Sequence, residues 1–230
     1  MHILYEDYHL IAVNKPAPML TQAPADIPSL EAMVKAYIKE KHQKPAGVYL
    51  GIPHRLDRPV SGVVLFARNT KAAARVAEQF QKHIVTKVYW GWVEGMVAED
   101  AGEWIDHLCK IESESRAEIV ASGTERSKEA ATTFRVLQRQ DDRTLLEFTP
   151  RSGRFHQLRV QAAGRGHPIL GDFLYGGTRP FGPLTELPRD RLISLHARSL
   201  TLVHPFSKEP LRIEAPLPEL WESQTSPATS

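Results

Sequence analysis

Apolar residues recur with helical spacing in two segments of the chain. Five of them in residues 29–41 occupy positions i, i+3, i+4, i+7 and i+8: Leu30, Met33, Val34, Tyr37 and Ile38. Ser29 stands where an N-cap is expected. A second helix is predicted from Thr70 to about His83, with Ala73, Val76, Ala77 and Phe80 on its buried side.

Short runs of alternating or continuous apolar residues predict the strands. They cover residues 3–5, 10–13, 63–67, 87–93, 131–137, 144–149, 194–203 and 211–213. Residues 101–128 are polar and are predicted to form hairpins and irregular surface loops, and residues 155–163 fit a strand or a helix. Since neither a repeat nor a linker interrupts the pattern, we predict one domain over 1–221 and a flexible Ser/Thr-rich tail over 222–230.

The overall composition is that of a soluble globular protein. Of the 230 residues 42% are apolar and 24% charged, and the net charge is only +2, so local charge patches say more about partners. The single cysteine, Cys109, excludes an intrachain disulfide and fits a reducing compartment. Neither a membrane-length apolar run nor a signal peptide is recognisable, and we expect a cytoplasmic protein. The histidines lack metal-ligand spacing, so we expect no metal site.

One carboxylate stands alone in a long stretch without other acids. Asp57 is the only acidic residue from Lys41 to Ala77, and Arg55 and Arg58 lie beside it. A carboxylate among fixed cations is stabilised as the anion, so its pKa should fall. Asp57 is therefore a candidate nucleophile or base, and the alternative is a structural Arg–Asp ion pair.

A second stretch, from Phe148 to Gly171, has no acid and is rich in cations and hydrogen-bond donors. These are Arg151, Arg154, His156, Arg159 and Arg165. Such a segment is suited to clamp phosphate or a carboxylate, and the alternative is a solvated basic face. Asp172, in the glycine-punctuated loop that follows, is the main rival of Asp57, although a turn or cap carboxylate is the better interpretation. Tyr89 is either a core tyrosine or a surface on which a base stacks.

Taken together, these segments resemble the RluA-type family of RNA pseudouridine synthases. Five motifs carry the resemblance in the family's order: His54-Arg55-Leu56-Asp57 with Ser61-Gly62, Lys87-x-Tyr89, Gly153 to Arg159, Gly166 to Gly176, and Leu195-His196-Ala197 followed by His204-Pro205. The opening residues Ile3 to Asp7 and Val13 to Pro16 also match, so the resemblance spans about residues 3–220.

The resemblance implies both a fold and a reaction. The fold is α+β, with a mixed, mostly antiparallel central sheet, flanking helices and an RNA-binding cleft. In the reaction the N1–C1′ bond of a uridine breaks, the uracil turns, and a C5–C1′ bond forms without any cofactor. The uracil must leave its stack to be reached. The expected partner is tRNA or rRNA, with no membrane and no obligate protein partner, and the protein is expected to be a monomer.

The same resemblance assigns roles to individual residues. Asp57 falls on the catalytic aspartate, Arg154 on the arginine that pairs with it, and Tyr89 on the tyrosine that stacks on the uracil. Arg55 fills the space of the flipped nucleotide or holds its phosphate. Asp57 can act on C1′, on uracil C6, or as a base at the 2′ position, and these routes stay open. The remaining arginines and His156 are the expected substrate contacts.

Four residues depart from the family pattern. They are Gln22, Val60, Ser152 and Gln161. None removes the aspartate, the tyrosine or the arginine, so they bear on substrate contacts. Two alternatives are a non-catalytic RNA-binding module of the same fold and a two-carboxylate glycosidase. The glycosidase needs a second acid near Asp57, which the acid-free stretches disfavour unless Asp172 supplies it.

Overall fold

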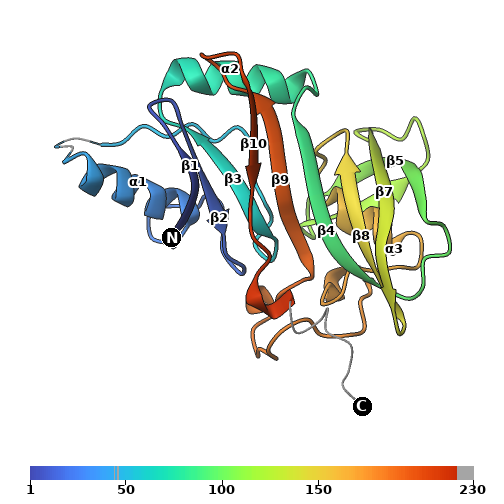
Figure 1. The fold of residues 1–230 in the computed structure, drawn as a ribbon. Helices are drawn as coiled ribbons and strands as arrows, with labels where there is room; N and C mark the ends of the chain where they lie inside the picture. Colours follow the sequence, from blue (N-terminus) through green and yellow to red (C-terminus); the bar gives the residue numbers. More distant parts are fainter. Residues whose placement is uncertain (44, 46, 222–230) are drawn as a thin grey trace. The chain divides into compact units, whose positions relative to one another are not determined.

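The chain folds into two compact units in a computed structural model that describes residues 1–43, 45 and 47–221. Unit 1 comprises Met1–Val85 and Ala197–Pro218, and unit 2 comprises Thr86–His196 together with Glu219 to Trp221. Figure 1 shows the two sets of strands that build them. The tail predicted over 222–230 lies outside the described residues.

Unit 1 is built on strands from both ends of the chain. They are β1 (His2–Glu6), β2 (Leu10–Lys15), β3 (Ser61–Ala67), most of β9 (Leu195–Val203) and β10 (Pro210–Glu214). Their order is β1-β2-β3-β9, with β10 beside β9. β2 and β3 are antiparallel, with Leu10 opposite Ala67 and Lys15 opposite Gly62. This register brings the end of β2 next to the start of β3, where the Asp57 segment enters the sheet.

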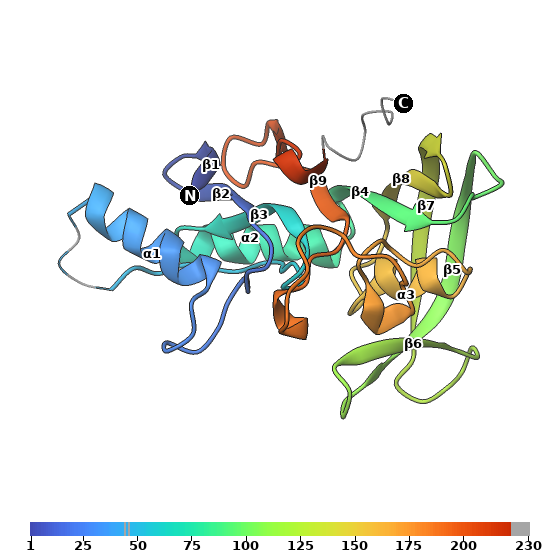
Figure 2. The same cartoon turned by 90° about the horizontal axis from the view of Figure 1, so that it is seen from below.

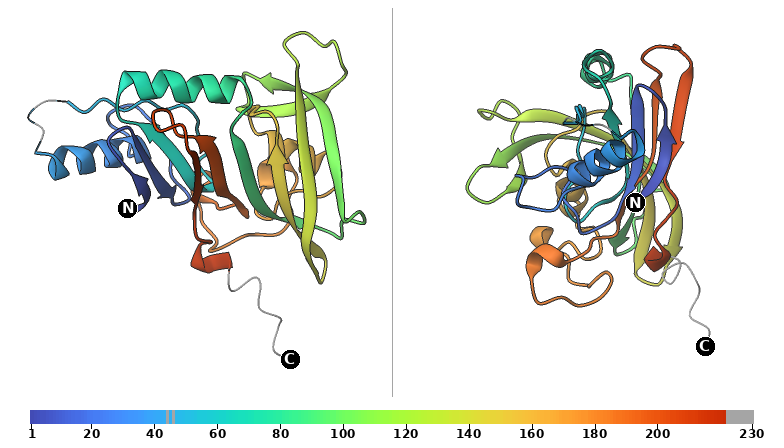
Figure 3. Two further views of the ribbon diagram at one scale, coloured as in Figure 1. Left: turned by 45° about the horizontal axis from the view of Figure 1, so that its top comes forward. Right: turned by 90° about the vertical axis from the view of Figure 1, so that its left-hand side faces the viewer.

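Two helices belong to unit 1, α1 (Leu30–Lys41) and α2 (Thr70–Gln81). Each begins at a residue whose side chain accepts a backbone N–H: Ser29 from Ala32 at 3.3 Å and Asn69 from Ala72 at 2.9 Å. α2, the turquoise helix in Figure 3, contacts β3 and contributes Ala72 and Val76 to a core shared with Leu10 and Leu65. The predicted helices are confirmed, although the buried alanine of α2 is Ala72.

Unit 2 is an antiparallel sheet on which the short helix α3 packs. The strands are β4 (Thr86–Glu94), β5 (Ala101–Ile111), β6 (Arg116–Val120), β7 (Lys128–Gln140) and β8 (Arg143–Pro150), in the order β4-β8-β7-β5-β6. α3 (Gln157–Ala163) packs against β5 and β6, and Figure 2 shows it beside them. Two short 3-10 turns follow, η1 (Phe173–Tyr175) and η2 (Pro188–Asp190).

The expected α+β class and the predicted strands are confirmed. The hairpin expected within 101–128 is confirmed as well: β5 and β6 form it, with Trp104, Leu108 and Ala117 buried, and loops occupy only 112–115 and 121–127. The ambiguous residues 155–163 form α3. Among the described residues, no helix is long and apolar enough to cross a membrane.

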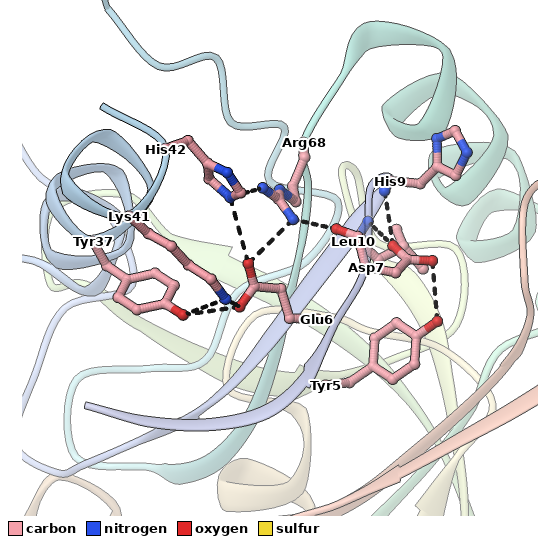
Figure 4. Close-up of polar contacts among 9 residues, drawn as sticks. All are labelled: Tyr5, Glu6, Asp7, His9, Leu10, Tyr37, Lys41, His42 and Arg68. Carbon is pink, nitrogen blue, oxygen red and sulfur yellow. Dashed lines mark hydrogen bonds and ion pairs between the residues drawn. The ribbon is translucent and has the colours of Figure 1, made fainter. Parts of the chain in front are cut away.

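A polar cluster ties the edge strand β1 to α1 and to the end of β3 (Figure 4). The Glu6 carboxylate accepts from Lys41 Nζ at 2.8 Å, from Tyr37 OH at 2.9 Å and from Arg68 Nη1 at 3.2 Å. Burial raises the pKa of Glu6, but these donors and cations outweigh it and leave the pKa lowered. The anion therefore anchors three elements of unit 1 to one another.

Candidate active site

Asp57 lies in a tight turn just before β3 in unit 1. Val60 N–H donates to Asp57 O at 3.1 Å, which closes the turn, and β3 begins at Ser61. The residue before Asp57 is held on both sides, because Leu56 N–H donates to Thr21 Oγ1 at 3.1 Å and Thr21 Oγ1 donates to Leu56 O at 2.9 Å. The half-buried Asp57 therefore sits on a backbone that is fixed by neighbouring hydrogen bonds.

The second residue of β3, Gly62, occupies a position that only a glycine fits. Its φ is +114°, a conformation that residues with a side chain rarely adopt. A Cβ atom there would lie only 2.6 Å from Ala197 N of β9 and would also clash with Ala197 O. The close approach of β3 to β9 thus depends on Gly62. It fixes the point at which the Asp57 turn joins the sheet.

Lys15 is a buried cation at the end of β2 that the sequence reasoning did not single out. Its Nζ donates to Met19 O at 2.7 Å, to Arg58 O at 3.2 Å and to Pro16 O at 3.3 Å. Burial lowers the pKa of Lys15 to about 7, the charge of Asp57 opposes this shift, and that of Arg58 adds to it. Lys15 thereby fastens the Asp57 turn to the sheet. A lysine that closes an apolar strand was the available signal.

In unit 2, Tyr89 and Trp90 of β4 point to opposite faces of the sheet, as the alternation predicts. Tyr89 is paired with Phe148 and Trp90 with Glu147 across to β8. Phe148 is in turn opposite Phe134 on β7, two residues after Thr132, whose Oγ1 hydrogen-bonds to Gln157 and Gln161 of α3. Tyr89 therefore lies on the face that carries α3. Trp90 lies on the other face, where its Nε1 donates to Glu147 at 3.1 Å.

Arg154 lies next to a second cation on the same face of unit 2. Lys87 Nζ donates to Ser152 O at 2.6 Å, and burial, with the charge of Arg154 as the smaller cause, lowers the pKa of Lys87 to about 8. Arg154 is held by its own backbone N–H, which donates to Gln157 Oε1 at 3.0 Å, and by its Nε, which donates to Glu129 O at 3.0 Å. The two cations and Tyr89 make this face attractive to an anion.

Arg159 lies in the interior of unit 2 instead of at the surface expected of a phosphate ligand. Its Nε and Nη2 donate to Asp172 at 2.6 and 2.8 Å, and both side chains are almost wholly buried. The bidentate pair joins α3 to the loop before η1. Asp172, the rival carboxylate, is thus bound to Arg159 within unit 2.

His156 belongs to the same buried network. Arg159 Nη1 lies 2.9 Å from His156 Nε2, and His156 Nδ1 lies 2.9 Å from Tyr175 OH, which accepts Ala117 N–H at 2.8 Å. Because Arg159 can only donate, Nε2 accepts and the proton of the neutral ring is on Nδ1. Burial first, and the charge of Arg159 second, lower the pKa of His156 to about 3. His156 thus links α3 to β6 as a neutral ring.

The other predicted basic residues differ in their surroundings. Arg151 forms an exposed ion pair with Glu103, and Arg165 pairs with Asp106 at 2.9 Å while lying over the Trp104 ring. Arg55 is exposed and donates to Gln22 at 3.4 Å. The backbone oxygen of Arg58 accepts a hydrogen bond from Lys15 Nζ. Asp57, Arg55 and Arg58 are together in unit 1, and Tyr89 and Arg154 are together in unit 2.

No group of three or more metal-ligating side chains is gathered anywhere in residues 1–43, 45 and 47–221. The chemistry that the site offers comes from carboxylate, guanidinium, ammonium and aromatic groups. An anion in a fixed turn can act as a nucleophile or base, and the cations can hold phosphate.

Comparison with known proteins identifies the family. The family model described as RNA pseudouridylate synthase matches residues 9–164. The chain is 34% identical to tRNA pseudouridine synthase C of Salmonella typhi, over 96% of this chain and 87% of that protein. It is 33% identical to ribosomal large subunit pseudouridine synthase D of Xylella fastidiosa, over 95% of this chain and 66% of that protein.

A solved structure agrees with these sequence relatives. Human RNA pseudouridylate synthase domain containing 4 superposes with a TM-score of 0.78 at 26% identity, covering 96% of this chain and 90% of that one. The match of the family model spans the Asp57 turn, the Tyr89 strand and the Arg154 segment, in both units. The chain therefore belongs to the RNA pseudouridine synthases of the RluA type.

Proposed function

We propose that this chain isomerises uridine to pseudouridine in tRNA, with Asp57 as the catalytic carboxylate and Tyr89 and Arg154 as its partners in the active site. Enzymes of this family perform the isomerisation itself. The proposal concerns the RNA and the residues. The observation that carries it is the Asp57 turn, whose backbone is held by Thr21 and Lys15 although its carboxylate is not fully buried.

Three chemical events define the work of the site. The N1–C1′ bond of the target uridine breaks, the uracil turns within the pocket, and C5 bonds to C1′. The C5 proton is then lost and N1 gains a proton, so no atom is gained or lost overall. The Asp57 anion acts on C1′, on C6 or as a base at the 2′ position, and each of these roles requires a carboxylate that stays ionised.

The remaining residues bind and orient the substrate. Tyr89 lies on a sheet face with Lys87 and Arg154, which suits an aromatic ring that stacks on the flipped uracil beside cations that attract phosphate. Arg154 is proposed to pair with Asp57 and keep it ionised. Arg55 is exposed in the Asp57 segment and is proposed to occupy the place of the flipped nucleotide or to bind its phosphate.

The buried position of Arg159 changes its proposed role. Because Asp172 already holds its guanidinium, Arg159 is proposed to position α3 and the Arg154 segment, not to touch phosphate. His156 has the same role through Tyr175. Arg151 and Arg165 carry ion pairs at the surface of unit 2 and remain candidates for weak phosphate contacts.

Three further assignments accompany the proposal. We propose that both units form one catalytic domain, because the family match extends across them. Transfer RNA is favoured because relatives named tRNA pseudouridine synthase C align over 87–95% of their length. The protein is proposed to act in the cytoplasm, as a monomer and without a cofactor.

The test is pseudouridine formation in RNA made by transcription, which carries no modifications. Purified chain is incubated separately with a tRNA pool and with rRNA, and pseudouridine, which has the mass of uridine, is detected by chemical labelling. We expect product in the tRNA arm. Product confined to rRNA would overturn the choice of substrate, and binding without product would favour the non-catalytic module.

Asp57→Asn gives the decisive variant. It keeps the size of the side chain but removes the anion, and we expect the rate to fall by at least ~10³-fold while RNA affinity is retained. Asp100→Asn, which changes an exposed carboxylate of unit 2, is the matched control and should keep full activity. Near wild-type rates for Asp57→Asn would refute the role of Asp57. Release of free uracil would instead indicate a glycosidase.

A further inference from the structure

An exposed aromatic ring immediately follows Arg154. Phe155 has 39% of its surface accessible, which is unusual for a phenylalanine next to the start of a buried helix. In the sequence, Phe155 stands within the basic segment 151–159. An exposed ring of this size indicates either a binding partner or a structural role in the packing of its neighbours.

An unusual backbone conformation next to Phe155 accompanies the exposure of its ring. His156, the residue between Phe155 and α3, has a φ of 53°, in the left-handed region that is costly for residues other than glycine. In this conformation the two neighbouring rings stack, with centroids 3.9 Å apart and planes at 17°. The His156 ring is held by its contacts with Tyr175 and Arg159. Phe155 therefore stacks on a ring that is itself fixed, while part of the Phe155 side chain stays exposed.

One cation lies over this ring, and two more lie at or next to the residue before it. Lys110 of β5, an exposed residue, places its Nζ 5.2 Å from the centre of the Phe155 ring. Arg154 is the residue before Phe155, and Lys87 is the second cation beside Arg154. A flat aromatic ring close to cations matches the chemistry of unpaired nucleic acid, in which bases stack and phosphates need positive charge.

We propose that Phe155, supported by His156 and flanked by Lys110, is a stacking platform for an unpaired nucleotide of the RNA substrate, next to the site that takes the target uridine. The inference rests on the proposed function and adds a requirement to it, namely that the RNA offers an unpaired base beside its target. Lys110 leaves the ring and binds the phosphate of the stacked nucleotide.

A second exposed phenylalanine supplies a matched control. Phe173 of η1 is 40% accessible and has the guanidinium of Arg191 5.0 Å from its ring centre. It belongs to the same unit but is not adjacent to Arg154 and does not stack on His156. Its substitution therefore tests whether any exposed ring with a cation gives the same effect.

The experiment compares the full chain and its variants in binding a fluorescently labelled 12-nucleotide single-stranded RNA and the duplex of that RNA with its complement. We expect Phe155→Leu, which keeps an apolar side chain but no flat ring, to weaken single-strand binding by about 5- to 50-fold and to leave duplex binding unchanged. Phe155→Trp should bind at least as tightly as the wild type, and Phe173→Leu should bind within about twofold of it, as expected of a surface change outside the platform.

Each departure from this pattern contradicts the platform. Wild-type affinity of Phe155→Leu, an equal loss for Phe155→Trp, an equal loss for Phe173→Leu, or an equal loss on the duplex would each overturn it. Lys110→Gln should lower the slope of log affinity against log salt by about 0.7, one phosphate contact on a single strand. An unchanged slope would remove Lys110 from the proposal.

The two proposals fail in different ways. If transcribed tRNA is isomerised but Phe155→Leu binds the single strand as the wild type does, only the platform is wrong. If no RNA is isomerised but Phe155→Leu still loses single-strand binding selectively, the platform stands as an RNA-binding feature and the proposed reaction fails.

Discussion

Buried polar side chains hold the segments that carry the candidate catalytic residues. Lys15 and Thr21 fasten the backbone around Asp57 in unit 1. Gln157 does the same for Arg154 in unit 2, where its Oε1 accepts from Arg154 N–H and from Ser152 Oγ. These buried side chains make hydrogen bonds to the backbone. Because hydrogen bonds are directional, they fix the conformation of the segment more specifically than apolar packing does.

Lys15 leads to a prediction on pH. Its folded pKa of about 7 lies below the ordinary value of 10.5, so the unfolded chain binds more protons between these values and stability rises with pH. We expect the free energy of unfolding, measured with urea, to increase more from pH 7 to pH 9 in the wild type than in Lys15→Met. Lys39→Met changes an exposed lysine and should keep the wild-type pH dependence.

If Lys15→Met showed the same rise with pH as the wild type, the buried ammonium would not be the cause. The variant is also expected to lower activity, because Arg58 O and Met19 O lose their donor and the Asp57 turn loosens. Activity loss alone would not distinguish this role from general damage, whereas the pH dependence of stability does.

Tyr89 is expected to act mainly through its ring. Tyr89→Phe keeps the ring and should retain RNA affinity, whereas Tyr89→Leu removes it and should lower kcat/KM by about 10²-fold, the scale of one lost stacking interaction of roughly 3 kcal/mol. The measurement is steady-state pseudouridine formation. A large loss of kcat in Tyr89→Phe would point to proton transfer by the hydroxyl, and full activity of both variants would exclude Tyr89 from the site.

The helices α1, α2 and α3 differ in what determines their start. α1 and α2 begin with side-chain caps, Ser29 and Asn69, and each has one apolar side. α3 begins after His156, which makes no capping hydrogen bond, and six of its seven residues are buried. Its position depends on the contacts of Arg159 with Asp172 and of His156 with Tyr175, two partners that no local signal indicates. α3 is therefore defined by contacts with distant segments.

The buried pair between Arg159 and Asp172 is expected to be the most sensitive point of this element. Asp172→Asn leaves the Arg159 guanidinium buried without its counter-charge and should lower the free energy of unfolding by about 3–5 kcal/mol. The double variant Arg159→Met with Asp172→Leu removes both charges and should recover much of that loss. Urea unfolding measures both. A double variant no more stable than Asp172→Asn would show that the ion pair itself is required.

On the scale of the whole molecule, charge is distributed unevenly around a net value of only +2. Many arginines are paired with carboxylates, as Arg151 is with Glu103 and Arg165 with Asp106. Exposed cations such as Arg55 and Lys110 remain to meet a polyanion. Long-range attraction of RNA is consequently set by a few local residues and not by the overall charge.

RNA affinity is expected to fall with salt despite the small net charge. Binding of transcribed tRNA, followed from low to physiological salt, should give a clearly negative slope of log affinity against log salt. Arg55→Gln should reduce that slope by about 1, while Arg189→Gln, in η2, should leave it unchanged. A flat salt dependence in the wild type would contradict charge-driven binding.

The sequence alone determined the elements whose signals are local. The helices 30–41 and 70–81 were predictable because one side of each is apolar with the period of a helix, and their caps stand next to them in sequence. Asp57, Tyr89 and Arg154 were proposed from motifs. Their local settings, a turn, a strand and the segment before a helix, agree with the expectation, while their joint action remains a prediction.

Only the tertiary structure decided where polar residues find their partners. The sequence predicts Arg159 as a phosphate ligand, but its pairing with Asp172 places it in the interior, and the supporting role of Lys15 follows only from its donation to three carbonyl groups. The length and bounds of β5 within the expected hairpin became clear only in the fold, because its few buried residues are separated by exposed or half-buried ones. The physical reason is common to all: periodicity and caps depend on neighbours in sequence, whereas the burial of a charge depends on a partner that the fold brings from elsewhere.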